Sequence, residues 1–416
     1  MTSKDECFEG RREAVGPKKV LVGVTGGIAA YKAADLVSRL VKQGIQVQVI
    51  MTENAARFIS PLTFEALSGR PVWLDEFSTA GGLSVPHVQL AGEADLFVIV
   101  PATANTVAKL AWGMADNLLS AVALVYNKTL LIAPAMNTNM YHHPALQENL
   151  KILKSRGVCV IEPDSGRLAC GATGPGKLAP VEEIVALVQW HLFQPKKLLG
   201  KKVVVTAGGT RENIDPVRYI GNRSSGKMGF ALAQAAWLRG AEVVLIAGPV
   251  GLTPPSQVAF YPVESAREMR EVVLQHYDEA HIVVKAAAVA DYRVVDPGTQ
   301  KIKKREQDLE LVLTKNPDIL RELGEKKRHQ VLVGFAAETE ELLDNAQEKL
   351  VKKNLDLIVA NDVTRQDAGF NVDTNEVTLL FPDGRQELLP LMSKEALAHR
   401  IFEVIESLPR FQRFND

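Results

Sequence analysis

The chain has 416 residues, about three times the commonest domain size, so we expect two or three domains. Hydrophobic residues make up 46% of the sequence and charged residues 23%, which is typical of a globular protein and excludes collagen, coiled coils and disordered chains. The formal net charge of -1 gives no broad basic field, so nucleic acid is not an expected partner.

Cysteine usage and the first residues indicate where the protein works. The three cysteines, Cys7, Cys159 and Cys170, are too few and too oddly spaced for a disulfide framework or a tetrahedral zinc site, so we expect a reducing cytoplasm. No uncharged apolar stretch approaches the roughly 18 residues of a membrane helix, so no membrane partner is expected. Residues 1–18 lack an apolar signal core and are expected to form a disordered tail.

The first half of the chain begins with a strand, a glycine turn, a helix and a second strand. An apolar run at 20–24 and alternation at 46–50 predict the strands, and helical spacing predicts the helix over 31–43. Further apolar runs at 96–100 and 129–133 each end in a proline. Continuous apolar runs are typical of a parallel sheet covered by helices on both faces, so we predict an α/β domain over 19–193.

A stretch with proline, glycine and four lysines, residues 194–202, is the predicted linker. The strand, glycine and helix pattern then restarts, which predicts a second domain over 203–416. Its expected elements are strands at 203–206, 242–246, 282–288, 331–338, 356–361 and 377–381, with helices at 226–239 and 394–407. The predicted fold class is therefore α/β, with two doubly wound domains in tandem.

Both domains open with a glycine turn that does not match the dinucleotide fingerprint. The first, around Gly26 and Gly27, has Ile28 and Ala30 where further glycines belong, so it fits either a phosphate site or a plain tight turn. The second departs further, and no acid stands at the end of its next strand. NAD is therefore disfavoured in either domain.

Small polar side chains follow the later strands of the first domain. Residues 101–106 and 134–140 place hydroxyl and amide groups at the expected ligand edge, and Asp116 and Asn117 lie between them. Asp116 and Asn117 are equally typical of helix caps. Together the three clusters predict a bound cofactor.

Two residues of the first domain are candidates for proton chemistry. His87 is predicted in a loop before the third strand, where a surface or capping role is the alternative to catalysis. Cys170 lies in a glycine-rich loop over 165–176, and long loops of this kind often form lids. A cysteine on a lid indicates proton or thiol chemistry.

In the second domain, residues 221–228 nearly match the phosphate loop of P-loop nucleoside triphosphatases. Met228 replaces the required hydroxyl, and no strand is predicted to run into Gly221, so the P-loop class is excluded while an anion site remains possible. Lysines at 301–305, 315, 349 and 353 gather in this domain with a lone acid, Asp291. The alternatives are a solvated basic surface and a site for a metal and a triphosphate.

These motifs, in this order, resemble a known family. From about residue 19 to 410 the chain is similar to the bacterial bifunctional enzymes of coenzyme A synthesis, which join a phosphopantothenoylcysteine decarboxylase to a phosphopantothenate–cysteine ligase. The matching motifs are Gly-Gly-Ile-Ala-Ala-Tyr-Lys, Pro-Ala-Thr-Ala-Asn-Thr, Ala-Asp-Asn-Leu-Leu, Pro-Ala-Met-Asn, Asn-Arg-Ser-Ser-Gly-Lys-Met-Gly, Ala-Ala-Val-Ala-Asp-Tyr, Lys-Ile-Lys-Lys and Lys-Asn-Pro-Asp-Ile.

The resemblance implies a flavodoxin-like first domain that binds FMN. The matching cofactor positions are Gly26, Gly27, Ile28, Thr52, Thr103, Ala104, Asn105, Thr106, Asp116, Asn117 and Leu118. It also implies that His87 assists proton movement or steadies the substrate carboxylate, and that Asn137 holds that carboxylate. Met140 would lie in the substrate motif, and Cys170 would donate a proton from the lid.

For the second domain the resemblance implies a Rossmann-like ligase that uses CTP and Mg²⁺ to join 4'-phosphopantothenate to cysteine through an acyl-cytidylate. Lys301 would stabilise the α-phosphate and Asn222 would position the acyl intermediate, with Asp291 near the metal. The implied nucleotide contacts are Ala286, Ala287, Asp291, Pro317, Asp318, Ile319, Leu320, Phe335, Lys349 and Lys353.

The resemblance further implies a homo-oligomer, with flavin sites between subunits of trimers and a dimeric ligase domain. Two other functions fit parts of the sequence. One is a regulatory binding protein that keeps the flavin fold. A binding surface alone would not need all four of the predicted reactive residues, His87, Asn137, Cys170 and Lys301, so their presence together argues against this function. The other is a nicotinamide reductase.

Overall fold

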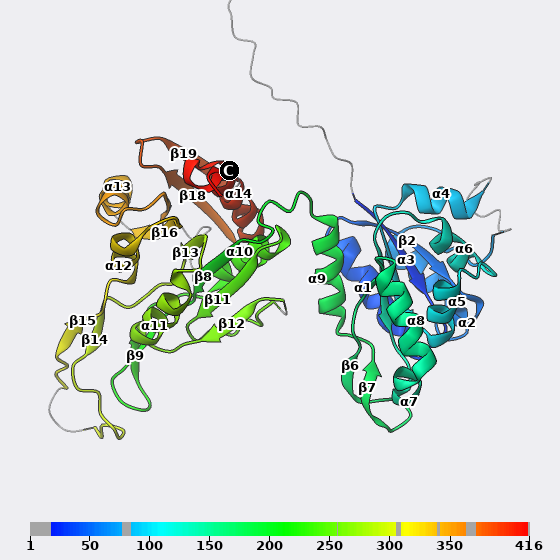
Figure 1. Ribbon diagram of the computed structural model, residues 1–416. Helices are drawn as coiled ribbons and strands as arrows, with labels where there is room; N and C mark the ends of the chain where they lie inside the picture. Colours follow the sequence, from blue (N-terminus) through cyan, green and yellow to red (C-terminus); the bar gives the residue numbers. More distant parts are fainter. Residues whose placement is uncertain are drawn as a thin grey trace, which may run out of the picture. The chain divides into compact units, whose positions relative to one another are not determined.

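The computed structural model describes residues 18–76, 85–255, 257–304, 309–338, 342–362 and 372–414 (Figure 1). Residues 1–17 of the predicted tail lie outside this part of the chain. The chain divides into two compact units, Met1–Leu192 and Phe193–Asp416, and each is described by itself. None of the described helices is long and apolar enough to cross a membrane.

The first unit contains a five-stranded parallel sheet in the order β2–β1–β3–β4–β5. This is the strand order of flavodoxin-like folds, in which ligands bind where the order reverses, between β1 and β3. The predicted doubly wound fold of this half is confirmed. The strands are β1 (Lys19–Val24), β2 (Gln46–Met51), β3 (Leu96–Ala102), β4 (Leu130–Pro134) and β5 (Cys159–Val160).

Helices cover both faces of this sheet, so alternate residues of each strand enter two separate cores. Val20, Val22 and Val24 pack with helices α1, α3 and α9, whereas Leu21 and Phe97 pack with α4, α5, α6 and α8. This two-sided burial explains the continuous apolar runs. The helices are α1 (Ala30–Lys42), α2 (Glu53–Ala56), α3 (Pro61–Ser68), α4 (Pro86–Glu93), α5 (Ala104–Trp112), α6 (Leu118–Val125), α7 (Thr138–His142), α8 (Pro144–Ser155) and α9 (Val181–Leu192).

The second unit is built on an eight-stranded sheet in the order β12–β11–β8–β13–β16–β17–β18–β19. Its first six strands are parallel and follow the Rossmann order, with the switch point between β8 and β13, and the last two are antiparallel. The Rossmann-like prediction is confirmed. The strands are β8 (Lys202–Ala207), β11 (Glu242–Ala247), β12 (Ala259–Pro262), β13 (Ile282–Lys285), β16 (Val331–Glu338), β17 (Leu357–Asp362), β18 (Thr374–Leu380) and β19 (Gln386–Ser393).

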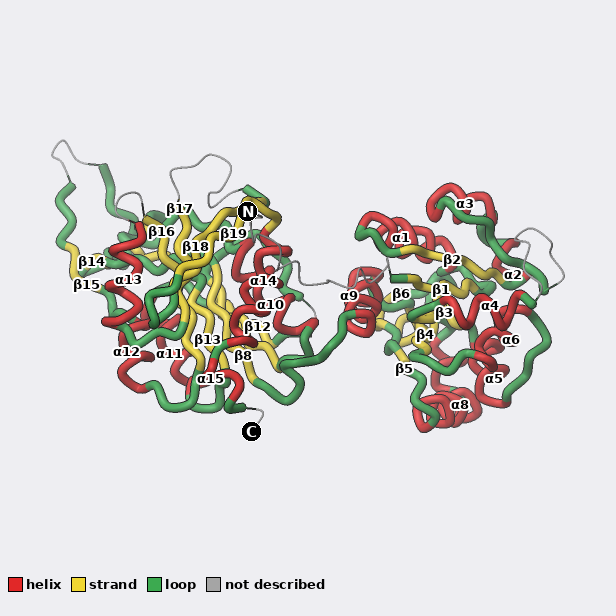
Figure 2. Tube along the Cα trace, turned by 90° about the horizontal axis from the view of Figure 1, so that it is seen from above, coloured by secondary structure: helices red, strands yellow, loops and turns green. Residues whose placement is uncertain are grey.

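Figure 2 shows the strands of the second unit between α11, α12 and α13 on one side and α10 and α14 on the other. Two small antiparallel ribbons, β9 with β10 and β14 with β15, extend from the loops. The helices are α10 (Lys227–Leu238), α11 (Ala266–Tyr277), α12 (Ile319–Lys326), α13 (Leu342–Lys352), α14 (Lys394–Ser407) and α15 (Pro409–Gln412), and the ribbon strands are β9 (Arg211–Asn213), β10 (Tyr219–Gly221), β14 (Tyr292–Val294) and β15 (Leu313–Lys315).

Three local predictions are corrected. His87 lies in helix α4 rather than in a loop, with Pro86 at the start of that helix. A short strand, β10, does run into Gly221. The strand predicted over 282–288 ends at Lys285, because the backbone N–H of Ala288 turns to donate to the carbonyl of Gly208 in the loop after β8, at 2.8 Å.

Candidate functional site

A pocket of about 800 Å³ opens at the carboxyl edge of the first sheet. Its walls come from the segments that follow β1, β2, β3 and β4, and from the hairpin formed by β6 (Asp164–Arg167) and β7 (Thr173–Lys177). The pocket therefore lies at the switch point of the sheet, where open α/β folds bind their ligands.

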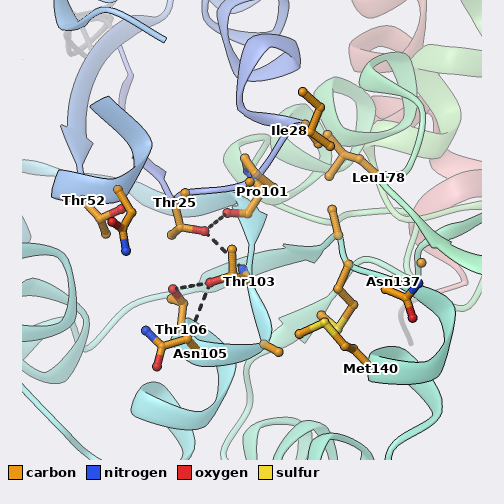
Figure 3. A pocket seen from close by; sticks show the side chains of 18 of the residues that line it. Thr25, Ile28, Thr52, Pro101, Thr103, Asn105, Thr106, Asn137, Met140 and Leu178 are labelled. Atoms are coloured by element: carbon orange, nitrogen blue, oxygen red, sulfur yellow. Dashed lines mark hydrogen bonds between the residues drawn. The ribbon is translucent and has the colours of Figure 1, made fainter. Parts of the chain in front are cut away.

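A network of threonines fixes the floor of this pocket (Figure 3). The Thr25 hydroxyl donates to the carbonyl of Pro101 at 2.6 Å and accepts from the backbone N–H of Thr103 at 3.1 Å. The hydroxyls of Thr103 and Thr106 lie 3.0 Å apart. Because Thr25 follows β1 and Thr103 follows β3, these bonds hold the two loops of the switch point together.

Several helices begin at the pocket, and pocket-lining side chains cap four of them. Thr52, Thr103, Asn117 and Asn137 are the N-caps of α2, α5, α6 and α7, and each accepts a hydrogen bond from a backbone N–H of its helix. Asn117 therefore has both of its predicted roles: it caps a helix and it lines the pocket. Helix N-termini favour anions, so this arrangement suits a phosphate-bearing ligand.

Gly26 is required by close packing rather than by backbone conformation. A Cβ atom at this position would lie 2.5 Å from Cβ of Asn54, whereas one at Gly27 would have no neighbour nearer than 3.8 Å. Beside them, Ile28 is 63% exposed and lines the pocket. An apolar side chain held open at a pocket wall suits a flat ring system.

The hairpin carries Cys170 to the pocket. Asn137 Nδ2 donates to Cys170 Sγ at 3.3 Å, while Asn137 Oδ1 caps α7. A backbone hydrogen bond at Ala172, and then the bond from Asn137, lower the pKa of the exposed Cys170 thiol. At the base of the hairpin, Gly176 has φ of +125° and packs so closely against the Met136 carbonyl that a Cβ there would lie 2.4 Å from it.

The structure brings most, but not all, predicted cofactor and substrate residues to this pocket. Among the described residues, its lining includes neither His87 nor Leu118. Leu118 is 1% exposed and packs in the core, and Nδ1 of His87 is buried without a hydrogen-bond partner in the described part of the chain. The predicted residues that do line it are Gly26, Gly27, Ile28, Thr52, Thr103, Ala104, Asn105, Thr106, Asp116, Asn117, Asn137, Met140 and Cys170.

Four basic side chains that were not predicted also line the pocket. They are Lys32, Lys109, Arg167 and Lys177. Lys109 pairs with Asp116 at 2.6 Å. Lys32 stands in the glycine-turn motif and Arg167 in the glycine-rich loop, so both could have been predicted as site residues from the sequence. Lys109 lies inside helix α5, and only the fold brings it to the pocket.

In the second unit the corresponding edge is formed by the loop over 286–291. Asn222 Nδ2 donates to the carbonyls of Ala288 and Val289, both at 3.2 Å, and the Thr210 hydroxyl accepts from the N–H of Ala290 at 2.9 Å. The turn after β8, the loop before α10 and the loop after β13 thus meet at the switch point. This arrangement places Asn222 on Ala288 and Val289, which follow the predicted nucleotide contacts Ala286 and Ala287 in the chain.

A charged group lies next to this loop, between α12 and α13. Asp318 caps α12 and pairs with Lys353, whose Nζ is 2.8 Å from one carboxylate oxygen. The bond from Lys353 offsets burial, so the pKa of Asp318 is lowered. Lys285, which begins the motif over 285–292 but was given no role from the sequence, is buried nearby. Burial lowers its pKa, the charge of Asp318 opposes this shift, and the charge of Lys353 adds to it.

The apolar part of the same region comes from β16 and α12. Ile319 is buried, and Phe335 is partly buried on β16. Leu320 packs closely against Gly334: a Cβ atom at position 334 would lie 2.9 Å from Cδ2 of Leu320. Pro317 and Lys349 are half-buried. The predicted nucleotide residues from 317–320 and 335–353 are therefore neighbours in the fold.

Lys301 is exposed and lies between β14 and β15 in the chain. The next residue is anchored: the N–H of Ile302 donates to Asp215 at 3.1 Å, and Arg218 donates to its carbonyl at 3.0 Å. Asp291 is exposed. No group of three or more His, Cys, Asp or Glu side chains that could hold a metal ion occurs among the described residues.

Two family models match the chain, one on each unit. Residues 10–192 match the model described as flavoprotein, and residues 198–408 match the DNA/pantothenate metabolism flavoprotein C-terminal domain. Together with the two sheet orders and the two switch-point sites, these matches define a flavoprotein domain followed by a domain of pantothenate metabolism.

Similar proteins cover nearly the whole chain. The coenzyme A biosynthesis bifunctional protein CoaBC of Bacillus subtilis (strain 168) is 50% identical over 94% of this chain and 98% of its own length. The CoaBC of Escherichia coli (strain K12) is 44% identical over 93% of this chain and 96% of its own length. A crystal structure of the C-terminal domain of a CoaBC protein has 42% identity over 53% of this chain and all of that chain, with a TM-score of 0.45.

The chain therefore belongs to the family of bifunctional coenzyme A biosynthesis proteins. It is an enzyme that joins a phosphopantothenoylcysteine decarboxylase and a phosphopantothenate–cysteine ligase in one chain. The alternative of a regulatory binding protein is not favoured by these relatives.

Proposed function

We propose that the first unit binds FMN and decarboxylates 4'-phosphopantothenoylcysteine to 4'-phosphopantetheine. The observation that carries this proposal is the pocket at the switch point, lined by helix N-termini, a threonine network and the Asn137–Cys170 pair. These groups fit a flavin mononucleotide, because the N-termini favour its phosphate and Gly26 and Ile28 leave an open wall for its ring.

Bound FMN supplies the two-electron acceptor that a simple carboxylate lacks. Asn137 is placed to hold the carboxylate that leaves, because its amide N–H is directed to the mouth of the pocket where Cys170 lies. The Cys170 thiol, on the hairpin, donates the proton that completes the product. Residues of the hairpin line this part of the pocket, so the thiol is carried to the place where the product forms.

His87 has a place in this proposal only if the protein is an oligomer. It lies on α4, outside its own pocket, with a buried and unpaired Nδ1 in the described structure. Because the resemblance places flavin sites between subunits, His87 would complete the site of a neighbouring copy and there steady the carboxylate or move a proton.

For the second unit we propose CTP-dependent ligation of 4'-phosphopantothenate with cysteine. Forming an amide from a carboxylate requires a leaving group, which an acyl-cytidylate provides while pyrophosphate is released. Asn222 positions the acyl group beside Ala286 and Ala287, and Lys301 stabilises the charge at the α-phosphate. The charged and apolar residues between α12 and α13 hold the nucleotide.

Mg²⁺ fits this site as a partner of the triphosphate rather than as a resident ion. Magnesium is commonly held by one or two carboxylates together with substrate phosphates, and Asp291 supplies one exposed carboxylate at the switch point. The metal would neutralise phosphate charge while Asp291 orients it.

The test separates the two units. Purified protein, reconstituted with FMN, should absorb near 450 nm and release carbon dioxide from 4'-phosphopantothenoylcysteine. Lys301→Gln should lower ligation by about 10²- to 10³-fold, the usual cost of removing a principal charge donor, and leave decarboxylation unchanged. Protein that cannot retain FMN, or a folded Lys301→Gln variant that loses both activities, would contradict the proposal.

A further inference from the structure

Lys285 is buried at the edge of the sheet where the second unit is proposed to bind its nucleotide. It is the last residue of β13, between β8 and β16, and the proposed nucleotide loop follows it directly. The side chain is only 7% exposed. Lysine is rarely buried to this extent unless it is paired, so its surroundings need an explanation.

The ammonium group of Lys285 has a poor internal partner. Among the described residues, Met269 Sδ is the one hydrogen-bond acceptor that Nζ reaches, at 3.7 Å. A thioether is a weak acceptor, and ammonium groups normally lie at about 2.7–2.9 Å from carboxylate oxygens. The protonated form of Lys285 is therefore not satisfied by the described protein groups.

The charged groups around Lys285 provide no carboxylate that pairs with its ammonium group alone. Asp318 lies near enough to favour the ammonium form, but its carboxylate is already paired with Lys353 at 2.8 Å and caps α12. On the neighbouring helices Arg270 and Glu322 neutralise each other at 2.6 Å, and Glu212 is bonded to the N-terminus of α11. Two lysines thus share one carboxylate.

The N-termini of α11 and α12 add to this excess of positive potential. Met269 belongs to the first turns of α11, and Asp318 is the cap of α12, so both helix starts lie near the Lys285 side chain. Helix N-termini carry partial positive charge and attract anions. A phosphate group placed over this region would supply the missing negative charge.

We propose that Lys285 is a positioning residue for the nucleotide, a buried countercharge that takes up a proton when the phosphate chain of CTP binds above it. This inference rests on the proposed ligase function. In the free protein, burial lowers the pKa of Lys285 to about 7, Asp318 opposes this shift and Lys353 adds to it. An anion nearby favours the charged form, so binding raises that pKa.

The affinity for CTP is expected to fall as pH rises, because binding is linked to protonation of Lys285. At pH 6 Lys285 is already protonated in the free protein, so binding needs little proton uptake. At pH 8 it is mostly neutral, so binding takes up as much as about 0.9 proton, and the affinity for CTP falls about tenfold between pH 6 and pH 8.

The experiment is calorimetric titration of Mg²⁺ and CTP into the full-length holoenzyme, in buffers of different ionisation enthalpy at pH 6 and pH 8. We compare the wild type with Lys285→Met, in which methionine matches the length of the lysine stem in apolar surroundings. Lys285→Gln is the second uncharged variant, and circular dichroism melts check that each is folded. Lys326→Met, which removes an exposed lysine of α12, is the matched control.

The wild type and Lys326→Met should take up about 0.9 proton more than Lys285→Met at pH 8 and about 0.1 more at pH 6. The comparison cancels the ionisation of CTP itself. Both Lys285 variants should bind CTP about tenfold more weakly at pH 6 and lose the Lys285-dependent decline with pH. Equal proton uptake in the wild type and the variants would overturn the role of Lys285 alone, whereas failure of all four proteins to bind CTP would overturn the ligase proposal and this inference together.

Discussion

At the scale of single residues, the pocket of the first unit depends on two glycines whose lack of a side chain allows close packing. Gly26 has no Cβ where Asn54 lies, and Gly176 has none where the Met136 carbonyl lies. Each glycine permits a close approach between segments that are distant in the chain, and each approach shapes the wall of the pocket. The adjacent Gly27, which has space around it, provides an internal comparison.

Gly26→Ala should destabilise the flavin-free protein by about 1–3 kcal/mol, because the added methyl must displace the segment around Asn54. Gly27→Ala should leave the free energy of unfolding nearly unchanged. Denaturant unfolding of the two variants, followed by the signal of the first unit, measures both effects. Equal destabilisation by the two substitutions would show that the close packing at Gly26 is not what requires a glycine.

At the scale of elements, short ribbons and hairpins position the reactive groups while the sheets position those ribbons. Asp215 shows this for Lys301. Its side chain accepts bonds from the Arg218 guanidinium and from the N–H groups of Val217, Arg218 and Ile302. The Arg218 guanidinium and these bonds outweigh its burial and hold the pKa of Asp215 well below its usual range.

Because the folded pKa of Asp215 is depressed, its carboxylate stabilises the protein above the unfolded pKa of about 3.9, and this contribution is lost as pH falls through the folded value. Asp215→Asn should therefore be less stable than the wild type at pH 7, with a difference that shrinks below about pH 4. It should also slow ligation and leave decarboxylation unchanged. The control is Asp296→Asn, which removes an exposed carboxylate that lies after β14, in the segment that carries Lys301. A matching loss in that variant would contradict the anchoring role of Asp215.

The sequence predicted elements well where their pattern was local. The strand runs at 20–24 and 331–338 and the helix at 394–407 match the structure closely, because buried strands and amphipathic helices carry their own periodicity. It did not predict that β13 ends at Lys285, because a bond from a distant turn terminates the strand. Nor did it give a role to Lys285, because the burial of this side chain beside Met269 of α11 depends on the fold.

At the scale of the whole molecule, the two units use one architectural rule for two reactions. Each has its candidate site at a switch point: in the first unit a pocket at the carboxyl edge of the flavodoxin-like sheet, and in the second the loops beside β8 and β13 of the Rossmann-like sheet. Because the candidate sites lie in separate compact units, we expect that each reaction can be removed without the other.

Cys170→Ser should retain FMN and ligation but lose the proton donor of the decarboxylase. Supplied with 4'-phosphopantothenate, cysteine and CTP, this variant should accumulate 4'-phosphopantothenoylcysteine, or an incompletely processed product of it, in place of 4'-phosphopantetheine. Mass spectrometry of the reaction mixture measures this. Unchanged 4'-phosphopantetheine formation would contradict the role of the hairpin cysteine.

One chain is expected to perform both consecutive reactions. Product analysis of the FMN-loaded wild type, supplied with 4'-phosphopantothenate, cysteine, CTP and Mg²⁺, tests this directly. We predict 4'-phosphopantetheine, carbon dioxide, CMP and pyrophosphate in equal amounts, with no product when CTP is left out. Formation of 4'-phosphopantetheine without CTP, or consumption of CTP with no cysteine-containing product, would contradict the account.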